Sequence, residues 1–290
     1  MSVYRSFIFA PGNHPRKVEK SLDLSADAII LDLEDAVALA EKPATRQTVV
    51  DALQLPRAGL GYVRVNAFDT TFCFGDLYAV IGPGLDGIML PKVEAAAQLI
   101  AVDWMISQLE SDRGLSPGCI DLLPIVETGK GLSNLDEICS ATDRVKRISF
   151  GAGDYTLDMG MQWSRDEREL EMARHAVVLA SRAAGIEPPL DTVWIHLGEL
   201  DAFTRSAERA RDLGFQGKMC IHPEQIEPVN QTFSPTDEAV EQARRYVEAF
   251  EEAEANGSAS IQVDGYFIDY PIVEKARRTL ATARAIKAAK

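Results

Sequence analysis

The stretches LLPIVETGKG, residues 122–131, and RISFGAGD, residues 147–154, share one pattern: an apolar run followed by a single carboxylate beside glycines. A run of continuous hydrophobicity is typical of a strand that is buried on both faces. Glycine weakens a strand, so glycines at its end indicate a bend or a close approach of another group to the backbone. The carboxylates of Glu127 and Asp154 therefore mark the ends of two buried strands.

Runs of the same kind recur along most of the chain. Helical patterns lie between them, for example over residues 15–24, 94–111 and 166–185. Strands that alternate with helices eight times predict a (β/α)8 TIM barrel, an α/β fold, rather than an open doubly wound sheet. The eight runs are residues 6–11, 28–35, 62–67, 87–93, 121–128, 147–154, 191–197 and 217–223.

A different pattern follows the eighth run, and we therefore divide the chain into a barrel, residues 1–233, and a C-terminal tail, residues 234–290. The tail begins with a helix that Ser234 is expected to cap. Asp264-Gly265 is a strong signal for a two-residue hairpin, and a last helix follows. So small a helix-hairpin-helix unit buries little by itself, so we expect it to pack on its own barrel or on that of a neighbouring subunit, as a lid or an oligomerisation element.

The charge and cysteine content exclude several classes of protein. A formal net charge of -14 argues against binding to nucleic acid or to an anionic membrane. The four cysteines have no metal-binding spacing, and the first apolar run is too short for a signal peptide. No stretch approaches the length of a transmembrane helix. We therefore expect a soluble, cytoplasmic protein.

The barrel fold brings Glu127 and Asp154 together, because the carboxyl ends of parallel strands meet at one mouth. Two carboxylates with no neighbouring His or Cys suit a hard divalent cation, and Mg²⁺ takes one or two carboxylates plus substrate oxygens. The alternative is structural: Asp154 caps the following turn and Glu127 pairs with a lysine such as Lys130.

Arg64 lies within the third apolar run, where a charge is rarely left without a partner. A guanidinium there is suited to bind a substrate carboxylate or thioester oxygen. The alternative is an internal ion pair with a carboxylate of the second run, namely Asp32, Glu34 or Asp35, and the two roles are compatible.

Other polar residues near the strand ends have two interpretations. Lys92 ends the fourth run, either as a Schiff-base lysine or, more simply, as an ion-pair partner of the carboxylates. His222 and His196 follow the last two runs as rim histidines or as bases, and Asp269 is by default the N-cap of the last helix.

Basic residues flank the first run and form a candidate binding patch for the phosphates of an extended anionic ligand. The alternative is a solvated helix face. The residues are Arg5, Arg16, Lys17 and Lys20.

Taken together, these segments resemble the citrate lyase β-subunit-like branch of the HpcH/HpaI aldolase superfamily from end to end. The motifs that carry the resemblance appear in family order. They are RSFIFAPGN, LDLEDAV with Lys42 and Arg46 after it, VRVNA, LPKVE, IVETGKG, FGAGDYTLDMG, GFQGKMCIHPEQIEPVNQTFSP and DGYFIDYP. One segment departs from the pattern, since His196 stands where relatives tend to have an aspartate, and this bears on the substrate.

The resemblance implies roles for particular residues. Mg²⁺ would be bound by Glu127 and Asp154, and Arg64 would contact the substrate. An acid/base role is implied for Asp269, delivered by the tail of a neighbouring subunit in a trimer. The residues that would line the acyl-CoA channel or lie near that ligand are Phe9, Arg16, Lys20, Ile221 and His222.

The activity implied is that of a magnesium-dependent carbon-carbon lyase, which cleaves or forms a 3-hydroxyacyl-CoA by retro-Claisen chemistry. Citramalyl-CoA, malyl-CoA and citryl-CoA fit, with a small 2-oxo acid and acetyl-CoA as products. The implied assembly is a homotrimer or a dimer of trimers. Two alternatives stay open: a free-acid aldolase for hydroxy-oxo acids, and a citrate lyase β subunit that acts on an acyl-carrier-protein thioester within a complex.

Overall fold

The structure, a computed structural model, describes residues 4–288. Within that range the chain forms two compact units, one of residues 4–230 and a second that begins at Gln231. No helix within the described range is long and apolar enough to cross a membrane.

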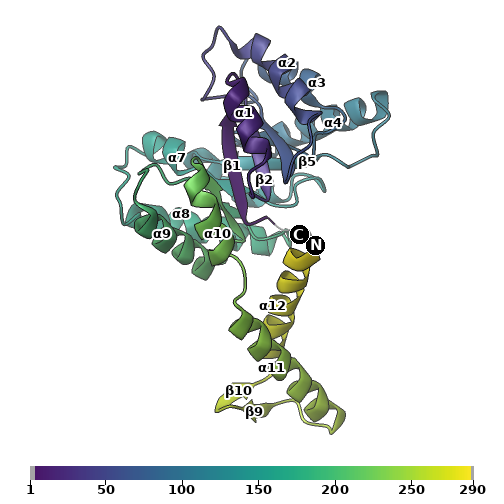
Figure 1. The fold of residues 1–290 in the computed structure, drawn as a ribbon, viewed down its shortest axis with the longest axis vertical. Helices are drawn as coiled ribbons and strands as arrows, with labels where there is room; N and C mark the ends of the chain where they lie inside the picture. The colour runs from purple at the N-terminus through teal and green to yellow at the C-terminus, as the bar shows by residue number, and fades with distance from the viewer. Residues whose placement is uncertain (1–3, 289–290) are drawn as a thin grey trace. The chain divides into compact units, whose positions relative to one another are not determined.

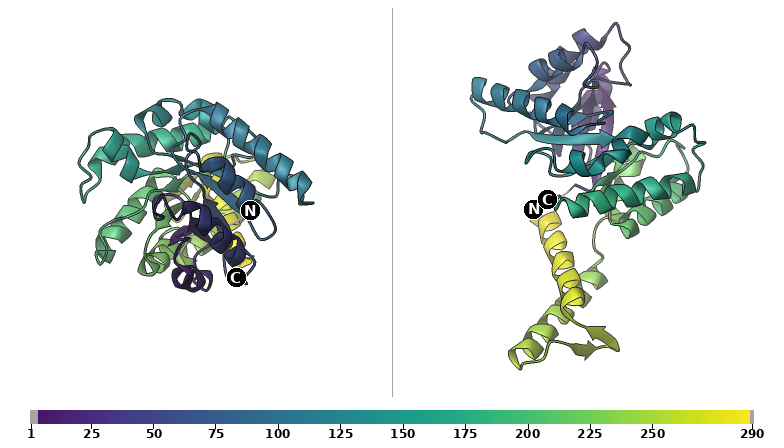
Figure 2. Two further views of the ribbon diagram at one scale, coloured as in Figure 1. Left: turned by 90° about the horizontal axis from the view of Figure 1, so that it is seen from above. Right: turned by 180° about the vertical axis from the view of Figure 1, so that it is seen from behind.

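The first unit is a closed barrel of eight parallel strands in chain order, in which β8 pairs with β1 (Figures 1 and 2). Each strand overlaps one of the eight apolar runs, so the predicted (β/α)8 barrel is confirmed. The strands are β1 (Ser6–Pro11), β2 (Ala28–Asp32), β3 (Leu60–Arg64), β4 (Gly87–Leu90), β5 (Asp121–Val126), β6 (Ser149–Phe150), β7 (Leu190–Asp191) and β8 (Gly217–Cys220).

Apolar side chains fill the barrel interior, which explains why the strands are hydrophobic with little interruption. Phe7 of β1 packs edge-on against Tyr62 of β3, with 5.2 Å between the ring centroids. The buried interior residues are Phe7, Ala28, Ile30, Tyr62, Met89, Leu123, Ile125, Leu190 and Met219.

Helices surround the strands (Figures 1 and 2). The helices are α1 (Pro15–Leu22), α2 (Lys42–Leu53), α3 (Cys73–Val80), α4 (Ala96–Asp112), α5 (Gly129–Ser133), α6 (Leu135–Cys139), α7 (Ala152–Asp158), α8 (Glu171–Ala183), α9 (Leu200–Leu213) and α10 (Ile226–Thr232), with short 3-10 helices η1 (Arg168–Leu170) and η2 (Pro223–Gln225).

The helical pattern predicted over residues 166–185 begins later than the sequence indicates. Glu167 adopts a φ of 52°, in the left-handed region, and the α-helix starts at Glu171. The Glu167 carboxylate is buried, where it pairs with Arg174 at 2.9 Å and accepts a hydrogen bond from Ser206 at 2.7 Å. These tertiary contacts hold the residue in a conformation that a helix excludes.

A polar network lies at the amino-terminal end of the barrel, opposite the strand ends that carry Glu127 and Asp154. The Tyr62 hydroxyl donates to Asp121 Oδ2 at 2.8 Å, and Arg147 pairs with the same carboxylate. The Arg147 guanidinium also lies over the ring of Tyr4, 3.7 Å from its centroid. Every charge of this network has a partner, as burial requires.

The second unit consists of α11 (Asp237–Ala255), β9 (Ile261–Val263), β10 (Tyr266–Ile268) and α12 (Tyr270–Ala288). The predicted hairpin is confirmed, since Asp264 and Gly265, with φ of 50° and 82°, join the paired residues Val263 and Tyr266. The predicted capping by Ser234 is wrong: the hydroxyl of Thr236 accepts a hydrogen bond from Ala239 N at 3.2 Å and caps α11. The unit has its own apolar cluster of Ala243, Tyr246, Phe250, Ile268, Val273 and Ala276.

Candidate active site

Four of the residues predicted to form the site line one cavity of about 180 Å³ at the carboxyl ends of the strands. They are Phe9, Arg64, Glu127 and Asp154. The barrel fold explains this convergence, because each of them lies in the carboxyl-terminal part of a parallel strand or just beyond its end. Apolar side chains complete much of the lining, namely Ile125, Phe150, Val193 and Met219.

The Glu127 carboxylate is deeply buried, with 4% of the residue exposed. Its Oε1 accepts a hydrogen bond of 2.8 Å from the backbone N–H of Lys92. Burial and then the neighbouring charge of Asp154 raise the pKa of Glu127 well above its ordinary value, to about 8. A buried carboxylate whose charge is disfavoured by a second carboxylate forms a site that a cation would stabilise.

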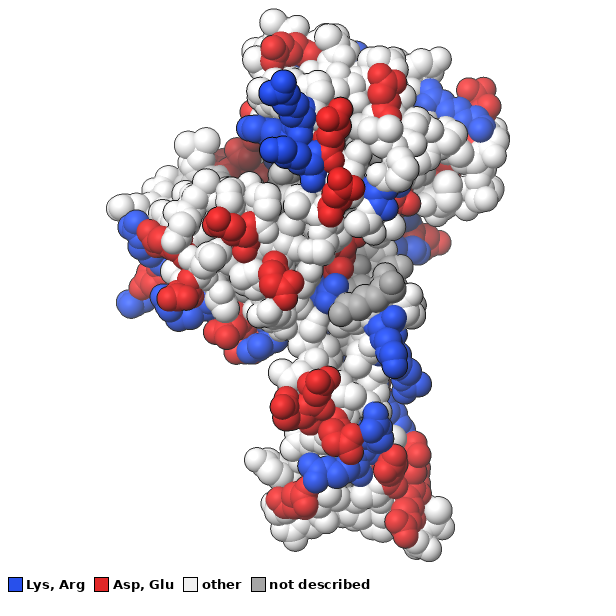
Figure 3. Space-filling model, viewed as in Figure 1, with Lys and Arg blue, Asp and Glu red and all other residues white. Residues whose placement is uncertain are grey.

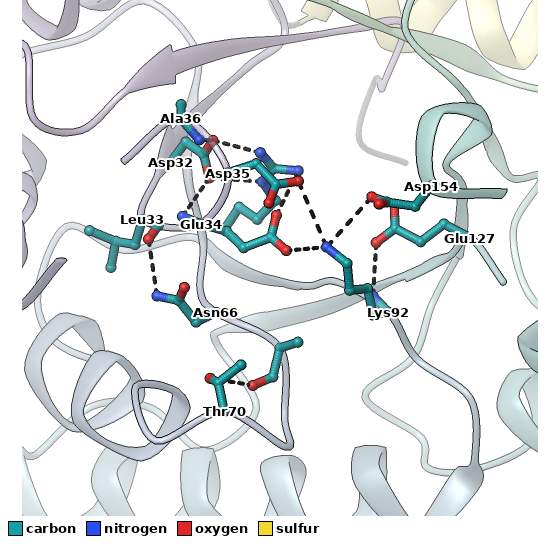
Figure 4. Close-up of polar contacts among 12 residues, drawn as sticks. Asp32, Leu33, Glu34, Asp35, Ala36, Asn66, Thr70, Lys92, Glu127 and Asp154 are labelled. Carbon is teal, nitrogen blue, oxygen red and sulfur yellow. Dashed lines mark hydrogen bonds and ion pairs between the residues drawn. The ribbon is translucent and has the colours of Figure 1, made fainter. Parts of the chain in front are cut away.

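The structural alternative fails in its two named contacts, the pairing of Glu127 with Lys130 and the capping of a turn by Asp154. Lys130 pairs with Glu94 at 3.0 Å, and Asp154 lies inside the first turn of α7 rather than at its N-cap, which is Gly151. In Figure 4 the carboxylates of Glu127 and Asp154 both point toward Lys92.

Arg64 forms the internal ion pair that the sequence offered as one of its two roles. Its Nε and Nη2 bind both oxygens of Asp32 at 2.8 and 2.6 Å, and Nη1 lies 3.0 Å from Glu34 Oε2. The guanidinium also stacks over Phe9, 4.7 Å from the ring centroid. Arg64 also lines the cavity, so the guanidinium that pairs with Asp32 and Glu34 is within reach of a ligand there.

Lys92 is an ion-pair partner of the carboxylates, as the simpler of its two interpretations held. Its Nζ lies 2.5 Å from Glu34 Oε1, 3.5 Å from Asp154 Oδ2 and 3.7 Å from Asp35 Oδ2 (Figure 4). Burial lowers the pKa of Lys92, but the hydrogen bond and charge of Glu34 outweigh it and raise that pKa above its ordinary value. A Schiff base needs a neutral amine, so this environment disfavours that role.

The charges around the cavity suit a hard divalent cation. Within residues 4–288 no group of three or more His, Cys, Asp or Glu side chains is arranged to hold a metal. A cation here would therefore take two carboxylates and complete its shell with water or substrate oxygens, which is how Mg²⁺ is usually bound. When ionised, five carboxylates outnumber two cations in this cluster, which consists of Asp32, Glu34, Asp35, Glu127, Asp154, Arg64 and Lys92.

The raised pKa of Glu127 predicts how stability depends on pH in the presence of EDTA. The unfolded chain releases this proton near its ordinary pKa of about 4.3, whereas the folded chain keeps it up to about pH 8. Folding stability should therefore fall, by an amount on the order of a few kcal/mol, as the pH rises between these values. Thermal melts of wild type and Glu127→Gln across this range measure the contribution, and parallel curves would show that Glu127 titrates normally.

Gly151 is needed for the position of Glu127. A Cβ at this glycine would lie 2.4 Å from Glu127 Oε2 and 2.7 Å from Glu127 Cβ. Gly151→Ala should therefore displace the carboxylate and lower turnover by about tenfold or more, with a small change in melting temperature. Gly82→Ala is the matched control, because its Cβ would meet only Arg113 Nη1 at 4.0 Å. Full activity of Gly151→Ala would contradict the placement of Glu127.

Thr192 is a residue of the cavity that the sequence reasoning missed. Its hydroxyl accepts a hydrogen bond of 2.8 Å from Ala152 N and so fixes the start of α7, two residues before Asp154. The sequence signal that could have identified Thr192 is its hydroxyl at the position directly after β7.

Two other predicted residues, Arg16 and Lys20, lie on the exposed face of α1 rather than in the cavity. Together with Lys17 they form a basic cluster over α1, visible at the upper left in Figure 3. Arg5 was wrongly included in this patch. It precedes β1 at the opposite end of the strand and pairs with Asp27 at 2.7 Å.

Ile221 and His222 follow β8, and neither lines the cavity that contains Glu127. The His222 ring accepts a hydrogen bond of 3.4 Å from Glu224 N and caps the short helix η2. His196 packs edge-on against Trp194, with 5.3 Å between the ring centroids. These positions match the rim-histidine interpretation.

Asp269 lies in the second unit, immediately before α12. Its side-chain Oδ1 is 3.4 Å from Ile272 N, and its carbonyl accepts a hydrogen bond from Val273 N at 2.9 Å. Within its own unit Asp269 is therefore a helix N-cap, as the default interpretation held.

Comparison with known proteins places this geometry in a family. Residues 5–223 match the family model described as HpcH/HpaI aldolase/citrate lyase. The chain is 39% identical over 283 residues to the citrate lyase subunit beta of Leuconostoc mesenteroides subsp. cremoris, an alignment that covers 97% of this chain and 93% of the relative. It is 36% identical over 287 residues to the (3S)-malyl-CoA thioesterase of Cereibacter sphaeroides, covering 98% and 96% of the two chains.

A solved structure agrees with these sequence relatives. The CitE protein of Mycobacterium tuberculosis, in complex with magnesium, acetoacetate and coenzyme A, aligns with a TM-score of 0.79 and 30% identity, over 97% of this chain and 98% of the other. The matched family model spans most of the barrel, and the relatives are matched nearly end to end. The chain thus belongs to the HpcH/HpaI aldolase/citrate lyase family, and within it is a lyase of the citrate lyase β-subunit-like group.

Proposed function

We propose that this protein is a magnesium-dependent carbon-carbon lyase that cleaves a 3-hydroxyacyl-CoA to a 2-oxo acid and acetyl-CoA, or catalyses the reverse condensation. The observation that carries the proposal is the convergence of Glu127, Asp154 and Arg64 on one cavity. The relative crystallised with magnesium, acetoacetate and coenzyme A supports both the cation and the thioester.

The cleavage breaks the bond between the hydroxyl-bearing carbon and the carbon next to the thioester. The hydroxyl releases its proton to water, its carbon becomes the oxo carbon, and the electron pair of the broken bond forms the thioester enolate. Mg²⁺ held by Glu127 and Asp154 would polarise the hydroxyl and stabilise the negative charge that develops. Arg64 would bind the enolate oxygen, and its two hydrogen bonds to Asp32 would hold the guanidinium plane in position.

A proton must then reach the enolate carbon, and we assign this step to Asp269. Asp269 belongs to the second unit, and we propose that a neighbouring subunit supplies it in a homotrimer or a dimer of trimers. The exposed side chains of Tyr266, Phe267 and Tyr270 surround it in sequence and provide apolar surface for such a contact. With this role, we propose that the C-terminal tail, residues 234–290, serves as a lid and oligomerisation element for the barrel, residues 1–233.

The basic cluster of α1 is our proposed site for the phosphates of coenzyme A. Arg16, Lys17 and Lys20 are exposed, and among the described residues none of them forms an ion pair. Phe9, Ile221 and His222 would contact the rest of this ligand. The cluster is a local exception on a chain with a formal net charge of -14, so it would attract an anion where most of the surface repels one.

The direct test is condensation. Purified protein with Mg²⁺, acetyl-CoA and either pyruvate or glyoxylate should give the 3-hydroxyacyl-CoA, identified by mass spectrometry. A thiol reagent in the same assay reports whether the product thioester is also hydrolysed. Absence of product with both acids, together with absence of cleavage of citramalyl-CoA and malyl-CoA, would reject the proposal.

A second candidate is favoured by the 39% identical relative, which is one subunit of citrate lyase. In that case the chain would act on an acyl-carrier-protein thioester within a complex. Strict dependence on a carrier protein would support this candidate, and turnover of free CoA thioesters would reject it. Turnover of hydroxy-oxo acids without any thioester would instead identify a free-acid aldolase.

A further inference from the structure

Lys92 contacts both proposed metal ligands. Within residues 4–288, Arg64, the other cation of the cluster, forms no hydrogen bond or ion pair with either of them. Its backbone N–H binds Glu127 Oε1 at 2.8 Å, and its ammonium lies 3.5 Å from Asp154 Oδ2. The same ammonium lies 2.5 Å from Glu34 Oε1. Lys92 therefore bridges the carboxylates that follow β2, β5 and β6 (Figure 4).

The backbone of Lys92 is specialised for this position. Lys92 lies two residues beyond the end of β4, and its φ of 52° is in the left-handed region, which is disfavoured for a residue with a side chain. Such conformations persist where surrounding contacts fix them, and they are concentrated at functional sites. Here the bend lets one residue present its N–H to Glu127 and its ammonium to Asp154.

The side chains of Arg64 and Lys92, the two cations of the cluster, differ in how tightly they are held. Arg64 is held by two hydrogen bonds to Asp32, and 13% of its side chain is exposed. The side chain of Lys92 is 34% exposed on a flexible stem, and it has anchors in Glu34 and Asp35 besides Asp154. Lys92 can therefore leave Asp154 while it keeps a carboxylate partner.

A divalent cation held by Glu127 and Asp154 would need an oxygen of Asp154 as a ligand. The Lys92 ammonium, 3.5 Å from that carboxylate, would repel the cation. We propose that Lys92 is a positioning residue that competes with the metal for Asp154, and that metal binding shifts its ammonium onto Glu34 and Asp35. The ammonium thereby limits the affinity of the site for the cation. This inference rests on the proposed metal site.

The test measures metal binding rather than turnover. Wild type, Lys92→Met and Lys92→Gln are treated with EDTA, which is then removed, and the Kd of each for Mn²⁺ is determined by electron paramagnetic resonance. Both variants should bind Mn²⁺ at least about tenfold more tightly, because removal of a nearby positive charge strengthens the site. A lysine that merely supported the carboxylates would give the opposite result, since its loss would weaken binding.

Lys130→Met is the matched control, because Lys130 follows the same strand end as Glu127 but pairs with Glu94 at 3.0 Å. It removes one charge from the mouth without touching Asp154, so its Kd should stay close to that of wild type. Equal or weaker Mn²⁺ binding by the Lys92 variants overturns the role of Lys92 and leaves the metal site standing. Absence of Mn²⁺ binding in every protein, wild type included, rejects the metal site itself.

A measurement on wild type covers the case in which the Lys92 variants do not fold. The rate at which acetic anhydride modifies Lys92 is followed by peptide mass spectrometry with and without Mg²⁺. Release from Asp154 should raise this rate severalfold, whereas Lys130, which is already 67% exposed in its side chain, should react equally in both conditions. An unchanged rate at Lys92 overturns the inference.

Discussion

Glu127→Gln and Asp154→Asn are each expected to lower turnover by at least about 10³-fold while the protein stays folded. Each change keeps the shape of the side chain but removes one of the two charges that would hold the cation. Stabilisation by a metal of charge that develops in the reaction is worth several kcal/mol, and each 1.4 kcal/mol is about a factor of ten in rate. Turnover in the condensation assay and metal content after dialysis against Mg²⁺ measure the two losses together.

Thermal melts provide the control for these variants. Because burial, and then the charge of Asp154, raise the pKa of Glu127, the glutamine variant should melt at or above the wild-type temperature when EDTA is present. Loss of activity with a much lower melting temperature would indicate a damaged fold. Undiminished wild-type turnover in excess EDTA would contradict the role of the metal.

Asp269→Asn should lower turnover by about 10²-fold or more, the usual scale for a general acid or base. The amide still accepts the N-cap hydrogen bond from Ile272 N, so α12 should keep its stability. A large loss of turnover at an unchanged melting temperature therefore separates the chemical role from the structural one. Full activity of the Asp269→Asn variant would show that Asp269 serves only as a helix N-cap.

Mixed assemblies then show which subunit supplies Asp269. Inactive Asp269→Asn and inactive Glu127→Gln are mixed, dissociated and reassembled. If the acid comes from a neighbour, some sites combine an intact Asp269 with an intact Glu127, and part of the activity returns. No recovery, although mass spectrometry detects mixed oligomers, would place Asp269 in the site of its own chain.

The fold was predictable because the signals that decide it are local. Eight buried strands read as continuous apolar runs, and the Asp264-Gly265 hairpin follows from the backbone preferences of two residues. The errors arose where distant contacts override local preference. The segment around Glu167 reads as helix, but its burial against Arg174 and Ser206 gives it a left-handed backbone, and no local pattern reveals those partners.

The candidate site was predictable in position but not in its connections. Strand ends place Glu127, Asp154 and Arg64 at one mouth without any knowledge of side-chain geometry. The bridge from Lys92 to Asp154 requires a left-handed residue beyond β4, which the sequence around Lys92 does not indicate. The misplacement of Arg5 had a similar origin, since its partner Asp27 lies on a different segment of the chain.

The polar network of Tyr62, Asp121 and Arg147 links strands at the end of the barrel remote from the candidate site. Tyr62, Asp121 and Arg147 are different residues from those that line the candidate site. Mutations in the loops of the mouth can therefore accumulate at little expense to folding, so that one scaffold can be adapted to new acyl substrates over evolution. Directed evolution of this protein should begin in those loops and leave the polar network at the other end intact.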